Sequence, residues 1–126
     1  MDNRQFEARV ETAIQGLPYE FRERLDNIVV VVEEWPSQEQ LGSVGLSDPM
    51  ELLGLYEGVP LTYRSRDHAW GTPDKITIFR RPIQAICGSD EEVEDQIRET
   101  VVHEIAHHFG ISDAQIKLIE DERQGA

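Results

Sequence analysis

One cysteine, Cys87, is present in the 126-residue chain, so no disulfide can form within it. Long apolar runs are missing as well: no segment approaches the ~20 residues that a membrane-spanning helix needs. Residues 1–13 carry several charges and lack the continuous apolar stretch of a secretory signal. Together these absences lead us to expect a cytoplasmic protein that enters no membrane.

Positive charge is also scarce, with 12 Lys and Arg residues against 25 Asp and Glu residues and a formal net charge of −13 at pH 7. Proteins that bind nucleic acid need clusters of Lys and Arg to contact the phosphate backbone. We therefore expect no nucleic-acid partner. The acidity serves solubility and weakly favours basic substrates.

The most informative stretch is 101–113, with the sequence VVHEIAHHFGISD. His103 and His107 stand four residues apart, so on an α-helix their imidazoles lie on one face about one turn apart. Two imidazoles in this arrangement can hold one metal ion, and Glu104 projects beside them, where it could take a proton from a metal-bound water. The stretch therefore predicts a metal-dependent hydrolase. A solvated helix with incidental histidines is the alternative.

The residues after the second histidine indicate how a third ligand could reach the metal. Gly110 can end the helix, because glycine adopts a positive φ without steric cost. Asp113 follows three residues later, and we expect it to turn back toward the imidazoles as the third ligand. Glu120 in the following helix is the competing candidate. In that case Asp113 would only favour the start of the last helix through the helix dipole.

Hydrophobic spacing predicts one α+β domain over residues 1–126. Ser89 and Glu92 match a capping box that starts the histidine-bearing helix near Asp90. Residues 36–50 lack periodicity and contain Gly, Ser and Pro, which predicts a long surface loop. The expected helices are 3–16, 19–25, 90–109 and one from 113, with 120–126 frayed. About four strands are expected, at 28–32, 52–56, 59–63 and 75–80. The first strand should be buried on both faces, the middle two should form a hairpin, and Pro82 should end the last.

Four stretches together resemble one known family: LDNIVVVVEEWP, LLGLYEGVPLT, PDKITIFRRPI and HEIAHHFGISD. Over residues 25–119 the chain is similar to the bacterial minimal zincin-like metallopeptidases, small single-domain proteins with the motif H-E-x-x-H-x-x-G-x-x-D. The resemblance implies a twisted mixed sheet packed on the metal helix. It also implies Zn²⁺ held by His103, His107 and Asp113, with Glu104 as the base. No methionine follows the motif, so the methionine turn of larger metzincins is absent.

The predicted reaction is hydrolysis of a peptide bond by a metal-activated water, with Glu104 as general base. A peptide or protein is the expected partner, and a monomer is the simplest assembly. An extended peptide would pair with an exposed strand edge. The arm from Tyr56 to Tyr63 is expected to supply that edge or to lie near it.

Several further side chains could contribute, but each has a plainer structural interpretation. His108 lies about 100° around the helix from the second histidine. It is therefore interpreted as a surface residue or as a neighbour of a metal-binding residue, and not as a metal ligand itself. His68, Tyr56 and Tyr63 could polarise the substrate carbonyl, although loop or core packing is the better interpretation of each. Cys87 is interpreted as a buried structural thiol.

Three other functions stay open at this point. A metal-binding domain with little catalysis could regulate or bind a partner. A single-strand RNA nuclease is conceivable, because one endoribonuclease family arranges three ligands around a similar helix, but the net charge of −13 opposes it. Two histidines and a carboxylate also suit non-haem iron. A glutamate beside the first histidine, however, is what a hydrolytic zinc site needs.

Overall fold

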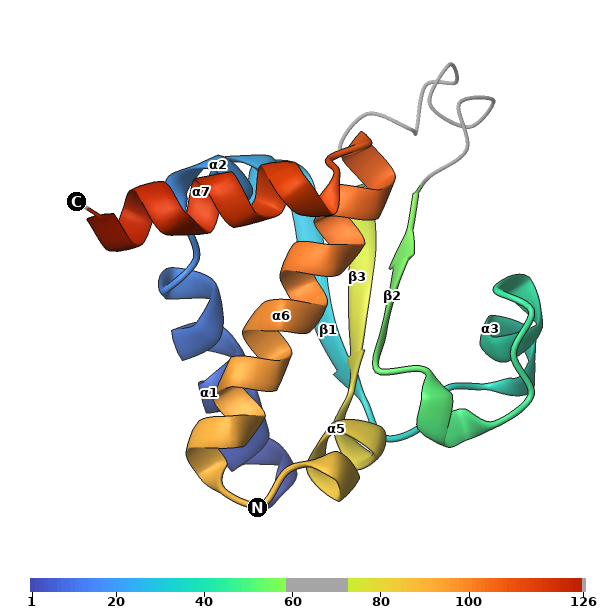
Figure 1. Cartoon of the computed structure of the whole chain (residues 1–126). Helices are drawn as coiled ribbons and strands as arrows, with labels where there is room; N and C mark the ends of the chain where they lie inside the picture. Colours follow the sequence, from blue (N-terminus) through green and yellow to red (C-terminus); the bar gives the residue numbers. More distant parts are fainter. Residues whose placement is uncertain (59–72, 126) are drawn as a thin grey trace.

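The computed structural model describes residues 1–58 and 73–125, with side chains described up to residue 122. It confirms an α+β fold, in which helices α1 and α6 cover one face of a small sheet (Figure 1). No helix of the described chain is long and apolar enough to cross a membrane. The elements are α1 (Asn3–Gln15), α2 (Tyr19–Arg24), a 3₁₀ turn (Leu25–Asn27), β1 (Ile28–Glu33), α3 (Gln38–Ser43), a second 3₁₀ turn (Pro49–Glu51), β2 (Gly54–Glu57), β3 (Asp74–Phe79), α5 (Arg80–Ile86), α6 (Asp90–Phe109) and α7 (Asp113–Gly125).

The sheet is mixed, with the strand order β1-β3-β2. β1 runs parallel to β3, and β2 runs antiparallel to it. β1 contains the expected run of β-branched residues, yet Val29 is 44% exposed, so the prediction of a strand buried on both faces was wrong. The predicted hairpin arm at 59–63 lies outside the described residues. Within the described chain, β2 is therefore an edge strand.

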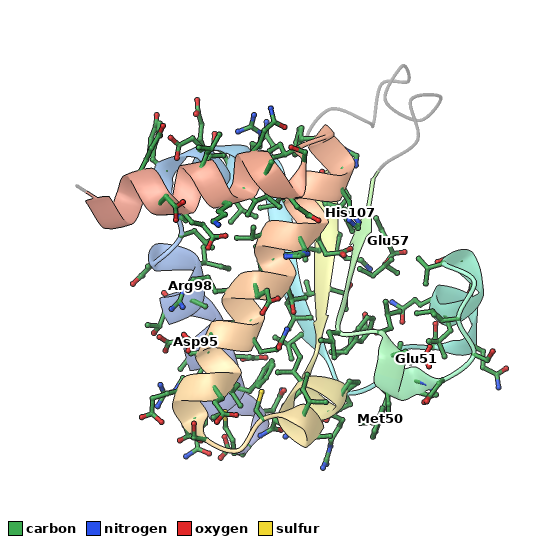
Figure 2. The ribbon with its side chains drawn as sticks, in the orientation of Figure 1. Met50, Glu51, Glu57, Asp95, Arg98 and His107 are labelled. Atoms are coloured by element: carbon green, nitrogen blue, oxygen red, sulfur yellow. The ribbon has the colours of Figure 1, made fainter. Side chains whose placement is uncertain are left out.

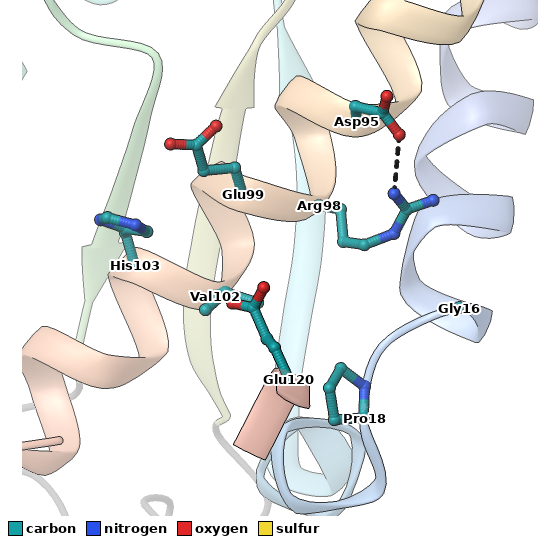
Figure 3. Close-up of a pocket in the computed structure, with 8 residues that line it drawn as sticks. All are labelled: Gly16, Pro18, Asp95, Arg98, Glu99, Val102, His103 and Glu120. Carbon is teal, nitrogen blue, oxygen red and sulfur yellow. Dashed lines mark hydrogen bonds and ion pairs between the residues drawn. The ribbon is translucent and has the colours of Figure 1, made fainter. Parts of the chain in front are cut away.

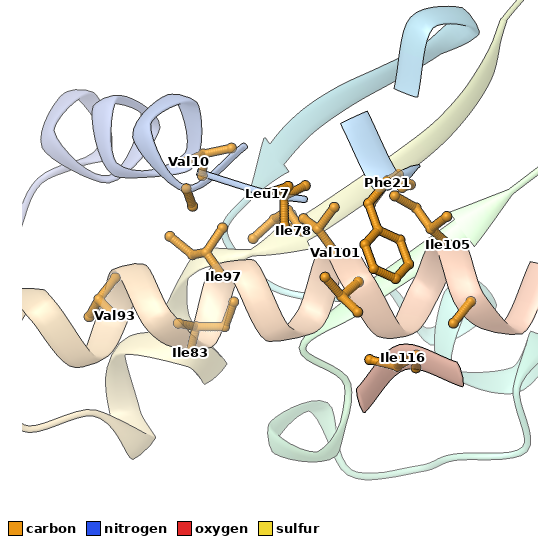
Figure 4. Close-up of a cluster of buried hydrophobic side chains, with 14 of the residues drawn as sticks. Val10, Leu17, Phe21, Ile78, Ile83, Val93, Ile97, Val101, Ile105 and Ile116 are labelled. Carbon is orange, nitrogen blue, oxygen red and sulfur yellow. The ribbon is translucent and has the colours of Figure 1, made fainter. Parts of the chain in front are cut away.

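The main hydrophobic core lies between the sheet and the helices α1 and α6 (Figure 4). The apolar positions of α6 cover most of its circumference, so the helix is buried on most sides and keeps one polar strip. This packing fixes the histidine-bearing helix on the sheet. The buried members of the core are Phe6, Val10, Ala13, Leu17, Phe21, Ile76, Ile78, Ile83, Val93, Ile97, Val101, Val102, Ile105, Ala106 and Ile116.

A second, smaller core corrects the prediction that residues 36–50 form a long loop. This segment contains α3 and a 3₁₀ turn, and α3 inserts one leucine into the small core. Ser37 Oγ accepts the Gln40 N–H at 3.0 Å, and Gln40 Oε1 accepts the Ser37 N–H at 2.8 Å. This capping box was the available sequence signal, but a helix of six residues is too short to show periodicity. The buried residues of the small core are Leu41, Leu52, Leu55 and Phe79.

Two predicted features, the end of β3 and the capping box of α6, also need correction. Pro82 does not simply close β3, because it lies in the first turn of α5, where a missing N–H costs no helical hydrogen bond. Ser89 caps α6 as predicted and accepts the Glu92 N–H at 3.2 Å. The Glu92 carboxylate, however, accepts from the Gly88 N–H at 2.8 Å, so only half of the expected capping box forms.

A buried arginine ties the start of α5 to β1 and to the N-terminus. Arg80 is 7% exposed, and its Nη2 donates to both carboxylate oxygens of Glu34 at 2.7 Å. Its Nη1 donates to the Met1 C=O at 2.9 Å and to Gln84 Oε1 at 2.7 Å. The hydrogen bonds from Arg80 lower the pKa of Glu34, with a smaller lowering by Arg81 and a partial opposing effect of burial.

We expect Glu34→Gln to destabilise the fold at neutral pH, because it leaves the buried Arg80 guanidinium without its counter-charge. A carboxylate whose pKa is lowered on folding stabilises the protein above its unfolded pKa, near 4.5, and loses that contribution as the pH falls. The difference in unfolding free energy between wild type and variant should therefore shrink below about pH 4.5. Urea denaturation at several pH values measures this. The exposed Glu39→Gln is the control, and a difference independent of pH would contradict the prediction.

Candidate metal centre

The C-terminal half of α6 carries the two histidines and ends in a sharp turn, as predicted. Gly110 adopts φ 71° and ψ 29°, a left-handed conformation that glycine takes without steric cost. The Ile111 N–H then donates to the Ala106 C=O at 2.8 Å. The chain turns here, and α7 leaves the C-terminal end of α6 and runs past α2 (Figure 1).

His103 and His107 are both exposed and stand one turn apart on the polar strip of α6. Figure 2 places His107 at the C-terminal end of α6, at the same end of the molecule as Glu57 in β2. Two neighbouring imidazoles open to solvent fit zinc in their chemistry. Within residues 1–58 and 73–122, however, no three His, Cys, Asp or Glu side chains are grouped so that they could hold a metal ion.

Glu104 differs from the histidines because it is partly buried and contacts β2. Its Oε1 accepts a hydrogen bond from the Tyr56 backbone N–H at 2.8 Å. Burial raises the pKa of Glu104, and this outweighs the lowering by the Tyr56 N–H and by the imidazoles of His107 and His103. A carboxyl group with a raised pKa accepts and releases a proton more readily near neutral pH.

The side chain of Tyr56 is held by two contacts next to Glu104. Its hydroxyl donates to Asp74 Oδ2 at 2.5 Å. Its ring stacks on the His108 imidazole, with centroids 3.9 Å apart and an interplanar angle of 14°. His108 Nε2 also lies 3.9 Å from Asp74 Oδ2. Tyr56, Asp74 and His108 thus form a cluster, named here the Tyr56 clamp, in which His108 lies beside the histidine pair and is itself exposed.

The bond to Glu104 shows which way the backbone of β2 points. Neighbouring residues of an antiparallel strand direct their N–H and C=O groups alternately to the two sides. Since the Tyr56 N–H donates to Glu104, the backbone N–H and C=O groups of Tyr56 and Gly54 point away from β3. Leu55, between them, pairs with Thr77 inside the sheet. Glu104 therefore lies at the outer side of the edge strand, where an added peptide strand would pair.

A cavity of about 670 Å³ opens beside His103, between α6, α7 and the turn from α1 to α2 (Figure 3). Arg98 in its wall donates to Asp95 at 2.8 Å and to Glu94 at 3.4 Å. Glu120 of α7 lines the same cavity as His103. The lining residues are Gly16, Pro18, Asp95, Arg98, Glu99, Val102, His103 and Glu120.

Asp113, the predicted third ligand, occupies the first position of α7 and is exposed. Ser112 and Gln115 form a capping box before this helix, with hydrogen bonds of 2.9 and 3.2 Å between backbone and side chain. A carboxylate at this position favours the helix through its dipole. In the described chain Asp113 is not grouped with the two imidazoles as a ligand set. α7 continues to Gly125, so the predicted fraying from residue 120 was wrong.

The close approach of α6 to β2 depends on one glycine. A Cβ added to Gly54 would lie 2.5 Å from Thr100 Cγ2 and 3.3 Å from the Thr77 C=O. Thr100 is buried in the face of α6 that packs on the sheet, one turn before Glu104. A side chain at Gly54 would therefore push α6 away from β2 and weaken the contact between Tyr56 and Glu104.

We expect Gly54→Ala to destabilise the protein by about 1–3 kcal/mol through overpacking. Thr100→Ser removes the crowded methyl group and keeps the hydroxyl that receives the Gln96 amide. The double variant should therefore be more stable than the sum of the two single effects predicts. Urea denaturation of the four proteins forms a double-mutant cycle. Strictly additive effects would show that the two positions do not meet.

The sequence of residues 25–123 matches a protein family described as zincin-like metallopeptidase. The match covers most of the chain. The chain belongs to the zincin-like metallopeptidase family. A comparison with curated proteins found no match. For this zincin-like metallopeptidase the family supports peptide hydrolysis and a zinc cofactor, and the resemblance seen in the sequence is confirmed over nearly the same residues.

In the part of the chain that the structure describes, the other candidate site residues of this zincin-like metallopeptidase are not seen next to His103 and His107. His68 and Tyr63 fall outside the described residues. Cys87 is half-buried, and burial together with Glu92 raises the pKa of its thiol. Cys87 precedes α6, whose first residue, Asp90, is already about 20 Å from His103 along the helix at 1.5 Å per residue. Cys87 is therefore too far away to bind the same metal.

Proposed function

We propose that this protein is a zinc-dependent peptidase in which His103, His107 and Asp113 hold the metal and Glu104 is the general base. One observation carries the proposal. Glu104 lies next to two exposed imidazoles of its own helix and at the outer edge of a strand that can bind a peptide. This arrangement supports the proposal, because a carboxyl group, two imidazoles and the edge of a strand occur in the same part of the structure.

A peptide substrate would lie extended along β2 and pair with outward-facing backbone groups that Glu104 leaves free, such as those of Gly54, because the Tyr56 N–H already donates to Glu104. Zinc, when bound, supplies a Lewis acid that makes water more acidic and polarises a carbonyl group. Glu104 accepts the proton of the attacking water and delivers it to the leaving amine nitrogen. Its partly buried environment supports this role, because burial favours the protonated form that must exist between the two transfers.

Asp113 is proposed as the third ligand because two imidazoles and a carboxylate leave a position open for water. Glu120 remains the competitor, since it lines the cavity next to His103. In either case the carboxylate has to approach the imidazoles when the metal binds. The proposal further assigns the protein to the cytoplasm, as a monomer that acts on peptides or proteins.

The test is proteome-wide mapping of new N-termini after addition of zinc-loaded protein. Wild type should generate a set of new termini that disappears with a chelator and returns with added zinc. Glu104→Gln, loaded with the same amount of zinc, should generate none. If wild type and Glu104→Gln give identical termini, the peptidase proposal is wrong, and a metal-binding domain that binds or regulates a partner is the better description.

A further inference from the structure

We propose that Tyr56 is a positioning residue, whose clamped side chain keeps its backbone N–H aimed at the Glu104 carboxylate. The inference rests on the proposed function, in which Glu104 carries the proton. Tyr56 acts through Glu104 and is not assigned a contact with the reacting atoms. The tyrosine ring thus serves catalysis through the position of its own main chain.

The Tyr56 clamp joins three elements at one residue. The Tyr56 hydroxyl donates to Asp74 of β3 at 2.5 Å, and its ring stacks on His108 of α6 at 3.9 Å. Asp74 and His108 also approach each other, with 3.9 Å between Oδ2 and Nε2. The side chain of one edge-strand residue is therefore attached both to the neighbouring strand and to the helix that carries Glu104.

An edge strand needs such attachment, because among residues 1–58 and 73–125 only one side of β2 is paired in the sheet. The N–H that holds Glu104 lies on the other side, so the small movements of an edge act on it directly. Glu104 is three residues before His107 and four before His108 on the same helix. Stacking of Tyr56 on His108 therefore connects the Tyr56 N–H to α6, the helix that carries its acceptor Glu104. This matters because displacement of a catalytic group by about 1 Å can cost 100-fold in rate.

Amide hydrogen exchange in the metal-free protein tests the contact without any activity. In Tyr56→Ala, exchange at residue 56 should be about tenfold faster than in wild type, the loss expected when a hydrogen bond to a charged group weakens. Tyr56→Phe keeps the stacked ring and should give a smaller increase, roughly threefold. The Leu55 amide, which pairs inside the sheet, should change less than twofold. Tyr19→Phe, at a 65% exposed tyrosine, is the matched control.

A merely structural role gives a different result. If the clamp only stabilises β2, exchange at residues 55 and 56 should accelerate together, which would overturn the proposal. Unchanged exchange at residue 56 in Tyr56→Ala, with loss of protection in Glu104→Ala, would overturn it as well. Either result can be obtained from Tyr56→Phe should the alanine variant fail to fold.

Kinetics of the zinc-loaded enzyme supply the second readout. Tyr56→Ala should lower kcat about tenfold, with KM and bound zinc within twofold of wild type, and Tyr56→Phe should recover most of the rate. A change confined to KM would contradict positioning of Glu104. If zinc-loaded wild type cleaves no peptide, the proposed function fails, whereas the exchange data still decide whether the clamp orients Glu104.

Discussion

The Glu104→Gln variant is expected to lower kcat for a cleaved peptide by about 10³-fold, within the range that general acid–base catalysis contributes. Glutamine cannot take the proton from water, but its side-chain oxygen can still accept the Tyr56 N–H. The fold and the two imidazoles should therefore stay in place, and zinc per chain should equal that of wild type. Steady-state kinetics together with metal analysis of the same sample measure both quantities.

The control for this variant is Glu91→Gln, an exposed carboxylate in the first turn of the same helix. It changes the net charge by the same amount at a place remote from the histidines, so its kcat should match wild type. A kcat for Glu104→Gln within tenfold of wild type would remove Glu104 from the chemistry. A loss of zinc along with the rate would instead make Glu104 part of the metal site.

The Asp113→Ala variant is expected to weaken zinc binding by at least about 100-fold. Loss of a group that merely supports a ligand costs 10–100-fold, so loss of a ligand should cost more. The fold should survive, because Asp113 is exposed and otherwise contributes only a helix-dipole interaction of about 0.3–1 kcal/mol. Competition of wild type and variant with a zinc chelator of known affinity gives the two dissociation constants.

Glu120→Ala is the comparison that decides between the two carboxylates. With Asp113 as the ligand, removal of Glu120 should change zinc affinity by less than about threefold. The reverse result, a large loss in Glu120→Ala and a small one in Asp113→Ala, would assign the third position to the cavity residue beside His103. Circular dichroism of both variants excludes an effect through unfolding of α7.

Local patterns were sufficient for the elements that are long or strongly marked. Both ends of helix α6 were predicted correctly, because the capping residue Ser89, Gly110 and an apolar periodicity of several turns all indicate the same helix. The helix α3 was missed, because its six residues bury one leucine and its capping box stood in a stretch rich in Gly, Ser and Pro. The helix α5 was missed because Pro82 was taken as a stop, although the first helical turn tolerates proline.

In the candidate site, too, local features could be predicted from the sequence and long-range contacts could not. The histidine pair and Glu104 follow from spacing on one helix, which sequence shows directly. The donor to Glu104 does not, because it is a main-chain N–H of Tyr56, 48 residues earlier, and any residue could supply it. The register of β2 and β3 and the fit of Gly54 against Thr100 create that contact. Both depend on tertiary packing between distant segments.

The most direct measurement of the central claim is zinc K-edge X-ray absorption of zinc-loaded wild-type protein. The spectrum should show two imidazole nitrogens with oxygen ligands at about 2.0–2.2 Å and no sulfur. His103→Ala and His107→Ala should each remove one imidazole or abolish binding. Fewer than two imidazoles in wild type, a sulfur ligand from Cys87, or no specifically bound zinc would contradict a metal centre on α6.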